Sequence, residues 1–384
     1  MTVRIGVLIN SYAGGGAERS SLLTAASWPR GEDVCVIACL AEGPYQSEIP
    51  QRVSTTEIGV WPSLANIAGF TRKLRTLVGV NELDAVMANG YGLNQAVLLA
   101  QLFSRLRGLS VIVVEHNTLS VALADRFPNR LMRGAVRVLT RWLYRRADAI
   151  VGVSDGVSRD LEATLSLPSG SVITIYNPVD TERITAAMTE PVPEALSRAF
   201  EALRRPIVIT TGRLVTQKAH RDLLAAFALL PEPTRGSLVI LGEGPLRGDL
   251  EQQAQQLGIA ERVWMPGFVE NPWWLMARSD VFALSSRWEG HPRVVLEALA
   301  CGIPVVSTDC PSGPRESHAD KPGARLAPIG DPSALAQAID ELLSSPTQAA
   351  SGISLDGYNP SRVAARYAEV ALEAHRSRAR RAHR

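Results

Sequence analysis

Short apolar runs alternate with longer segments of helical periodicity along this chain. Continuous apolar runs are typical of strands buried in a parallel sheet, and apolar residues three or four positions apart are typical of helices that cover it. The pattern predicts strands at residues 4–10, 34–39, 85–88, 111–115, 149–153, 172–176, 206–211, 237–241, 263–267, 280–284 and 303–307. This alternation indicates an α/β fold built on doubly wound sheets.

The turn signal at residues 177–180, Asn-Pro-Val-Asp, interrupts the alternation and predicts a domain boundary. A chain of 384 residues is too long for a single ordinary core, so two domains are expected. The predicted division is an N-terminal Rossmann-like domain at 1–178, a C-terminal Rossmann-like domain at 179–360 that opens with a helical connection at 181–205, and a final segment at 361–384. That final segment is predicted to be a helix over 361–374 followed by an arginine-rich tail.

Composition narrows the class of protein. A hydrophobic fraction of 46% and a charged fraction of 20% are typical of a globular enzyme, and a net charge of +2 gives no reason to expect a nucleic acid partner. The four cysteines show no metal-ligand spacing, so we expect core residues in a reducing compartment. Neither a signal peptide nor an apolar run near the roughly 20 residues that span a bilayer is present in the sequence. We therefore expect a cytoplasmic protein with at most peripheral membrane contact.

Residues 280–308 contain the strongest group of candidate functional residues in the sequence. A strand, a polar loop with Glu289 and Gly290, a helix opened by Pro292 and stopped by Gly302, and a second strand form a βαβ unit. Ligands of such units bind at the carboxyl end of the first strand. Glu289 and Glu297, with a helix N-terminus between them, suit a sugar phosphate. The alternative is that Glu297 pairs with Arg293 on an exposed helix face and that Glu289 is merely solvated.

Three other loops follow predicted strands. Gly14, Gly15 and Gly16 allow close approach of a ligand to the backbone, although a plain tight turn fits equally well. His116 follows the strand at 111–115, where it either binds a ligand or is a structural histidine satisfied by a neighbouring carboxylate or backbone group. Arg213 and Lys218 follow the strand at 206–211; two cations there suit a diphosphate, and the alternative is a pair of solvated surface cations.

These motifs resemble a known family. Glu289-x7-Glu297, followed by Ala-Leu-Ala-x-Gly-x-Pro-Val-Val-x-Thr and by the Pro-Ser-Gly-Pro-Arg-Glu run at 311–316, resembles the signature of the retaining GT-B glycosyltransferases of family 4. The run at 311–316 is a continuation familiar in bacterial members that build lipid-linked oligosaccharides or surface polysaccharides. His291 and Arg293 stand where many members have Phe and Asn. The resemblance implies two Rossmann-like domains facing a central cleft, with the acceptor on the N-terminal side, the nucleotide sugar on the C-terminal side, and a final helix returning to the first domain.

The implied activity is transfer of a hexose or N-acetylhexosamine, with retention, from a nucleotide diphosphate sugar, expected to be UDP-linked, to a hydroxyl of a glycan acceptor, expected to be lipid-linked. The sequence contains no Asp-x-Asp pair, so neither a metal nor another cofactor is expected. The catalytic residues implied are Glu289, His116, Arg213 and Lys218, and the donor-binding residues are Gly15, Gly16, Arg213, Lys218, Phe268, Val269, Glu289, Gly290, His291, Pro292, Arg293 and Glu297. Alternatives are a sugar-nucleotide epimerase on the same fold, a transferase with a soluble small-molecule acceptor, or a scaffold that has lost turnover.

A run of arginines predicts a surface for an anionic membrane. Between Phe127 and Ala147 the sequence contains no acidic residue, and five arginines recur at intervals of three or four. A basic amphipathic helix of this kind lies on anionic lipid, here at the inner face of the cytoplasmic membrane. The alternative is a solvated arginine face whose apolar side packs on its own domain. The residues are Arg130, Arg133, Arg137, Arg141 and Arg145, with Arg376, Arg378, Arg380, Arg381 and Arg384 of the tail as an addition.

Overall fold

The computed structural model describes residues 3–13, 15–30, 33–40, 43–63, 65–103, 106, 108–318, 321–344 and 353–382; Gly14 and Arg384 of the predictions lie outside these ranges. The chain forms two compact units. Unit 1 consists of Met1–Pro178 and Gly357–Arg384, and unit 2 is Val179–Asp356. Each unit has its own hydrophobic core.

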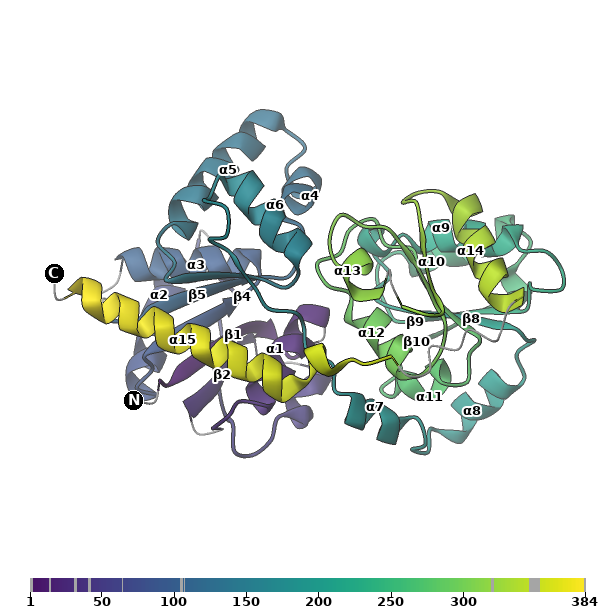
Figure 1. Ribbon diagram of the computed structural model, residues 1–384, viewed down its shortest axis with the longest axis horizontal. Coiled ribbons are helices and arrows are strands. Elements are labelled where there is room, and N and C mark those ends of the chain that lie inside the picture. Colours follow the sequence, from purple (N-terminus) through teal and green to yellow (C-terminus); the bar gives the residue numbers. More distant parts are fainter. Residues whose placement is uncertain are drawn as a thin grey trace. The chain divides into compact units, whose positions relative to one another are not determined.

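Unit 1 is built on a parallel sheet that has seven strands within the described residues, in the order β3-β2-β1-β4-β5-β6-β7. Figure 1 labels β2, β1, β4 and β5 of this sheet. The strands are β1 (Ile5–Ser11), β2 (Val34–Leu40), β3 (Ser54–Glu57), β4 (Ala85–Asn89), β5 (Ser110–Glu115), β6 (Ala149–Gly152) and β7 (Ile173–Thr174). The apolar pattern missed β3, because this edge strand reads Ser-Thr-Thr-Glu and is largely exposed. Edge strands are covered on fewer sides and need fewer apolar residues.

The helices of unit 1 cover both faces of this sheet. They are α1 (Gly16–Ala26), α2 (Ile67–Val80), α3 (Tyr91–Phe103), α4 (Leu119–Arg126), α5 (Arg130–Tyr144), α6 (Asp155–Leu165) and α15 (Pro360–Ala382), with short 3-10 turns η2 (Pro44–Glu48) and η5 (Asp356–Tyr358). The final helix α15 packs against α1 and β5. The prediction of a helix ending at residue 374 before a basic tail was wrong, because the helix continues to Ala382 and Arg378 on it pairs with the buried Asp148 at 2.9 Å.

Unit 2 repeats the architecture with a parallel sheet that has six strands within the described residues, in the order β10-β9-β8-β11-β12-β13. The strands are β8 (Ile207–Thr211), β9 (Ser237–Leu241), β10 (Val263–Gly267), β11 (Val281–Leu284), β12 (Val305–Thr308) and β13 (Ala324–Ala327). The helices are α7 (Thr181–Ala187), α8 (Glu194–Glu201), α9 (His220–Leu229), α10 (Arg247–Gln256), α11 (Pro272–Met276), α12 (Arg293–Ala300), α13 (Pro314–His318) and α14 (Pro332–Ser344), with 3-10 turns η3 (Thr216–Lys218) and η4 (Ala260–Arg262). The prediction of doubly wound α/β domains is confirmed for both units.

The strand order locates one binding position in each unit. The order reverses between β1 and β4 in unit 1, and between β8 and β11 in unit 2. Ligands of open α/β sheets bind at such switch points, beyond the carboxyl ends of the strands. The loops after β1, β8 and β11 carry several of the candidate site residues, whereas His116 follows β5 and Phe268 and Val269 follow β10. Cys35, Cys39, Cys301 and Cys310 are all buried, as predicted.

Candidate functional site

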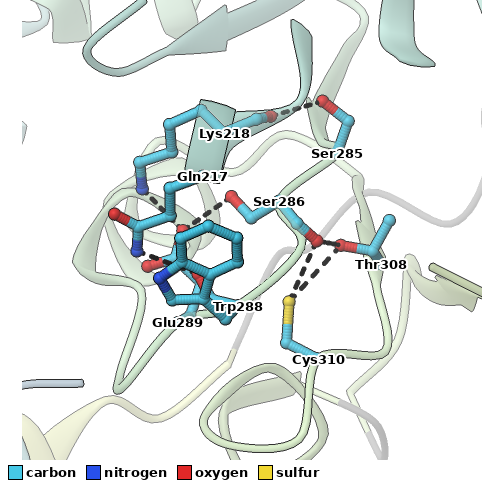
Figure 2. A network of polar contacts seen from close by, with 8 residues as sticks. All are labelled: Gln217, Lys218, Ser285, Ser286, Trp288, Glu289, Thr308 and Cys310. Carbon is cyan, nitrogen blue, oxygen red and sulfur yellow. Dashed lines mark hydrogen bonds and ion pairs between the residues drawn. The ribbon is translucent and has the colours of Figure 1, made fainter. Parts of the chain in front are cut away.

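Two loops of unit 2 are joined by hydrogen bonds at the switch point. The backbone N–H of Arg287 donates to the carbonyl of Gln217 at 2.8 Å, and Gln217 Nε2 donates to the carbonyl of Trp288 at 2.9 Å. Ser285 Oγ donates to the carbonyl of Lys218 at 2.9 Å (Figure 2). The loop after β8 and the loop after β11 are therefore fixed to each other, although about 70 residues separate them in sequence.

This junction brings Lys218 and Glu289 together. Lys218 Nζ lies 2.6 Å from Glu289 Oε1, and Ser286 Oγ donates to the same oxygen at 2.6 Å (Figure 2). The lysine side chain is 17% exposed and the glutamate 8%. The alternatives of a solvated Glu289 and a solvated Lys218 are therefore wrong. Removing two charges from water costs several kcal/mol per ion, so this pair is better explained by chemistry than by stability.

The loop after β11 is further held at the backbone of Ser286. Thr308 Oγ1 and Cys310 Sγ both donate to the carbonyl of Ser286, the latter at 3.1 Å (Figure 2). Burial raises the pKa of the Cys310 thiol to about 12, so the thiol stays protonated and remains a donor. Gly313, at φ +91°, lies in the loop after β12. A Cβ there would lie 2.6 Å from the carbonyl oxygen of Gly290, so the glycine lets this loop approach the loop after β11.

Glu297 lies inside unit 2. Arg293 Nη2 donates to Glu297 Oε1 at 3.2 Å, and Trp273 Nε1 donates to Glu297 Oε2 at 3.3 Å. The alternative interpretation, in which Glu297 pairs with Arg293, named the correct partner. It was wrong to expect an exposed helix face, because both side chains are buried. Trp273 was not among the predicted site residues. The sequence feature that could have indicated it is the pair of adjacent tryptophans after the turn that follows β10.

The remaining predicted residues of unit 2 lie on the same loops. Arg213 is exposed, and its side chain makes no hydrogen bond or ion pair with any described residue. His291 is buried, and burial together with the charge of Arg293 lowers its pKa to about 3, so it is neutral near pH 7. Gly290 and Pro292 flank His291 ahead of α12. Phe268 and Val269 follow β10, and Phe268 is 54% exposed.

Gly15, Gly16 and His116 belong to unit 1 and therefore form a separate group. Gly15 is the N-cap of α1 and makes no side-chain capping bond, and Gly16 is the first helical residue. His116 follows β5 and is buried, with Nε2 at 3.1 Å from Asn89 Oδ1. Its partner is thus a side-chain amide rather than a carboxylate or backbone group. Burial lowers the pKa of His116 to about 4, so this imidazole is also neutral.

Across the described residues, no group of three or more His, Cys, Asp or Glu side chains is placed to hold a metal ion. Within the same ranges, no helix is both long and apolar enough to cross a bilayer.

Comparison with known proteins identifies the family. The model described as Glycosyltransferase Family 4 matches residues 14–183, and the model described as Glycosyl transferases group 1 matches residues 194–354. The N-acetylgalactosamine-N,N'-diacetylbacillosaminyl-diphospho-undecaprenol 4-alpha-N-acetylgalactosaminyltransferase of Campylobacter jejuni is 30% identical over 351 residues, covering 88% of this chain and 90% of that protein. The GDP-mannose-dependent alpha-(1-6)-phosphatidylinositol monomannoside mannosyltransferase of Mycolicibacterium smegmatis is 29% identical, covering 72% of each chain.

Solved structures agree with these matches. The crystal structure of HepE from Anabaena in complex with UDP and glucose superposes with a TM-score of 0.74 at 22% identity, covering 97% of this chain and 98% of that one. A likeness at this identity shows the fold. Together with the family matches and the two parallel-sheet units, it shows that the chain is a glycosyltransferase of family 4 with the GT-B fold of two Rossmann-like domains.

Proposed function

We propose that the protein transfers a hexose or N-acetylhexosamine, with retention, from a UDP-linked sugar to a hydroxyl of a lipid-linked glycan during oligosaccharide or polysaccharide synthesis. The buried Lys218 to Glu289 pair at the switch point of unit 2 carries this proposal. Two relatives support its chemistry by name: HepE is described with UDP, and the Campylobacter enzyme with an undecaprenol-linked acceptor. The GDP-mannose-dependent relative makes GDP the competing nucleotide.

The pair gives each partner a role in the reaction. The bond between the anomeric carbon and the β-phosphate oxygen breaks, and the diphosphate that leaves gains negative charge. Lys218 exchanges Glu289 for that diphosphate, and the exposed Arg213 provides a second cation. Glu289, released from Lys218, orients the donor sugar and stabilises positive charge at its anomeric carbon. The acceptor oxygen forms its bond on the same face, and its proton passes to the leaving phosphate.

The helix α12 and its carboxylate complete the donor site in this proposal. The N-terminus of α12 lies next to His291 and Arg293, and its dipole favours a phosphate there. Glu297 binds the ribose hydroxyls, with Arg293 and Trp273 holding its carboxylate in place. No metal is required, since the positive charge comes from side chains and the helix.

A radiolabelled transfer assay tests the proposal. Purified protein is incubated with UDP-linked hexoses and N-acetylhexosamines, with GDP-mannose, and with a bacterial membrane lipid extract. Label on the lipid fraction, with the anomeric configuration of the donor retained by NMR, is the expected result. Rearranged free sugar nucleotide would instead mean an epimerase, and transfer to soluble sugars alone would replace the lipid-linked acceptor. An absence of any turnover would favour a scaffold.

The helix α5 supports the lipid-linked acceptor, because its apolar side faces outward. Leu131, Met132, Val138, Leu139 and Trp142 are between 42% and 86% exposed. The buried residues of α5 are instead Thr140, Leu143 and Tyr144. Thr140 Oγ1 is bonded to Tyr91 Oη at 3.1 Å and accepts from Gln95 Nε2 at 2.7 Å, and Tyr144 Oη donates to the buried Glu115. The alternative of a solvated arginine face with a packed apolar side is therefore wrong about these five apolar residues, and it agrees with the exposure of Arg130, Arg137 and Arg145.

The charge around this apolar surface favours anionic lipid as its occupant. Arg130, Arg137 and Arg145 are exposed, and the segment between Phe127 and Ala147 contains no acidic residue. An apolar helix side flanked by arginines suits an anionic membrane surface, where each arginine contributes about 1 kcal/mol. Arg133 and Arg141 are half-buried, and Arg378 is held by Asp148. The binding surface we propose therefore uses fewer arginines than the sequence pattern indicated.

Vesicle co-sedimentation tests this surface. Binding should require anionic lipid, weaken with added salt, and fall when Arg130, Arg137 and Arg145 are changed to Glu. Val138→Ser combined with Leu139→Ser should also weaken binding, since the apolar contact is lost. The matched control changes three exposed cations of α2 to Glu, which alters the charge equally on another helix of unit 1. Equal binding to neutral vesicles, or equal loss in the control, would contradict the proposal; the control residues are Arg72, Lys73 and Arg75.

A further inference from the structure

Asn89 lies at the switch point of unit 1 and has a fixed orientation. It is the last residue of β4, and its Nδ2 donates to the carbonyl of Leu8 on β1 at 3.1 Å and to the carbonyl of Met87 at 3.2 Å. Carbonyl oxygens accept hydrogen bonds only, so the amide nitrogen must face them. The oxygen Oδ1 is consequently directed toward His116, whose Nε2 lies 3.1 Å away.

This orientation determines the tautomer of His116. Because Asn89 Oδ1 can only accept, Nε2 of His116 carries the proton in this hydrogen bond. The imidazole is neutral near pH 7, since burial lowers its pKa to about 4. Its second nitrogen, Nδ1, then holds a lone pair. Nδ1 is buried and has no hydrogen-bond partner among the described residues.

A buried acceptor without a partner costs about 1–3 kcal/mol, and a ligand that donates a hydrogen bond removes that cost. Nucleotide sugars and glycans offer hydroxyl donors. Glu115, the ionisable residue next to His116, does not compete for this nitrogen, because it is bonded to Tyr144 and to Asn94 at 3.0 Å. His116 lies beyond the carboxyl end of β5, next to the switch point, where the fold places ligands.

We propose that Asn89 is a positioning residue, which fixes the ring orientation and the Nε2–H tautomer of His116 so that Nδ1 accepts a hydrogen bond from a sugar hydroxyl. The proposal rests on the proposed function, because that function supplies the sugar. It assigns a role to a residue that the sequence analysis did not select. The signal for it in the sequence was an asparagine followed by a glycine at the end of an apolar strand.

Nitrogen-15 NMR of histidine-labelled protein tests the tautomer directly, with His116→Gln used to assign the signal. In the unmodified protein at pH 7, Nε2 should be protonated and Nδ1 unprotonated. Asn89→Leu removes the acceptor, so the ring should lose its single orientation and tautomer. Turnover should then fall about 10-fold to 100-fold, with UDP affinity unchanged, because the proposed nucleotide contacts belong to unit 2.

Two further variants separate positioning from general support of the fold. Asn89→Asp keeps an acceptor opposite Nε2–H, so its turnover at pH 8 should exceed that of Asn89→Leu. Asn81→Leu removes a comparable amide bond, from Nδ2 to the carbonyl of Leu77 at 2.8 Å, and should leave the His116 tautomer and turnover unchanged. A protonated Nδ1 in the unmodified protein would overturn the proposal. So would an Asn89→Leu protein that keeps one tautomer, whether or not its turnover falls.

The NMR measurement does not depend on turnover. It can therefore test the role of Asn89 separately from the proposed function. The expected tautomer in a protein that transfers no sugar would refute the proposed function and leave no hydroxyl for Nδ1 to bind. Sugar transfer by a protein with the opposite tautomer would refute only the role of Asn89.

Discussion

The two switch points of this protein share one architecture and differ in charge. In unit 2, the loops after β8 and β11 carry the buried ion pair of Lys218 with Glu289, and α12 carries that of Arg293 with Glu297. In unit 1, the corresponding position carries a neutral imidazole bonded to a neutral amide. Open α/β sheets bind ligands at such switch points, and the side chains there determine which ligand fits. Paired charges suit a diphosphate, whereas neutral acceptors suit hydroxyls.

The ion pair in unit 2 gives both of its buried charges a partner within the chain. A lone lysine in this setting would be a buried charge without a partner, and Glu289 neutralises it. In the proposed function, an incoming diphosphate replaces the carboxylate as the partner of Lys218. The position in unit 1 needs no such exchange, because the His116 imidazole and the Asn89 amide are uncharged.

The largest expected effect comes from removing the cation of unit 2. Lys218→Ala should lower kcat about 10²-fold to 10³-fold, because the negative charge that develops on the diphosphate loses a directed donor. Steady-state kinetics measure the effect. The matched control is Arg221→Ala, which breaks an exposed ion pair with Asp249 in the same unit and should leave kcat nearly unchanged. Normal turnover of Lys218→Ala, or loss of wild-type activity with a chelator, would contradict this account.

Substitution of Glu289 should chiefly change kcat, whereas substitution of Glu297 should chiefly change UDP binding. Glu289→Gln should lower kcat about 10²-fold without weakening UDP binding, since Lys218 then loses a competing partner. Glu297→Ala should weaken UDP binding about 10-fold with a small effect on kcat, because ribose contacts are present in the ground and transition states alike. Calorimetry with UDP and steady-state kinetics measure the two quantities. If Glu289→Gln weakens UDP binding and Glu297→Ala lowers kcat, the two roles must be exchanged.

A smaller effect should appear in the pH dependence of unit 1. Burial raises the pKa of Glu115 from 4.5 to about 7, so the folded protein keeps a proton that the unfolded chain loses. The free energy of unfolding should therefore decrease as the pH rises from about 4.5 to 7, by up to about 3 kcal/mol, and then level off. Hydrogen exchange of the β5 amides measures this decrease, which Glu115→Gln should abolish.

The matched control for Glu115 is Glu373→Gln, which changes an exposed carboxylate on α15 of the same unit. Its β5 amides should show the same pH dependence as those of the unmodified protein. A pH dependence that survives in Glu115→Gln would place its origin in another group. It would also weaken the contrast between a neutral unit 1 and a charged unit 2.

The local pattern of apolar and polar residues was sufficient to predict most of the strands of this protein. Apolar runs gave the positions of β9 and β11 closely, because a strand buried on both faces must be apolar throughout its length. The same reasoning put Lys218 and Glu289 each in a loop that follows a predicted strand. It missed β3, whose residues are polar, and ended α15 too early, because the arginines after residue 374 resembled a solvated tail.

Partners that lie far apart in the sequence were decided by the tertiary structure alone. Lys218 and Glu289 are 71 residues apart, and Trp273 and Glu297 are 24 apart; both pairs depend on strand order, which apolar periodicity does not contain. The orientation of helix α5 on its domain also could not be predicted from the sequence pattern. Its sequence determined that it has an apolar side and a polar side. Only the tertiary structure decided that Thr140 and Tyr144 face inward, where α3 and β5 supply their hydrogen-bond partners, and that the apolar side lies exposed. A buried hydroxyl must be hydrogen-bonded, whereas an apolar side chain can be left exposed.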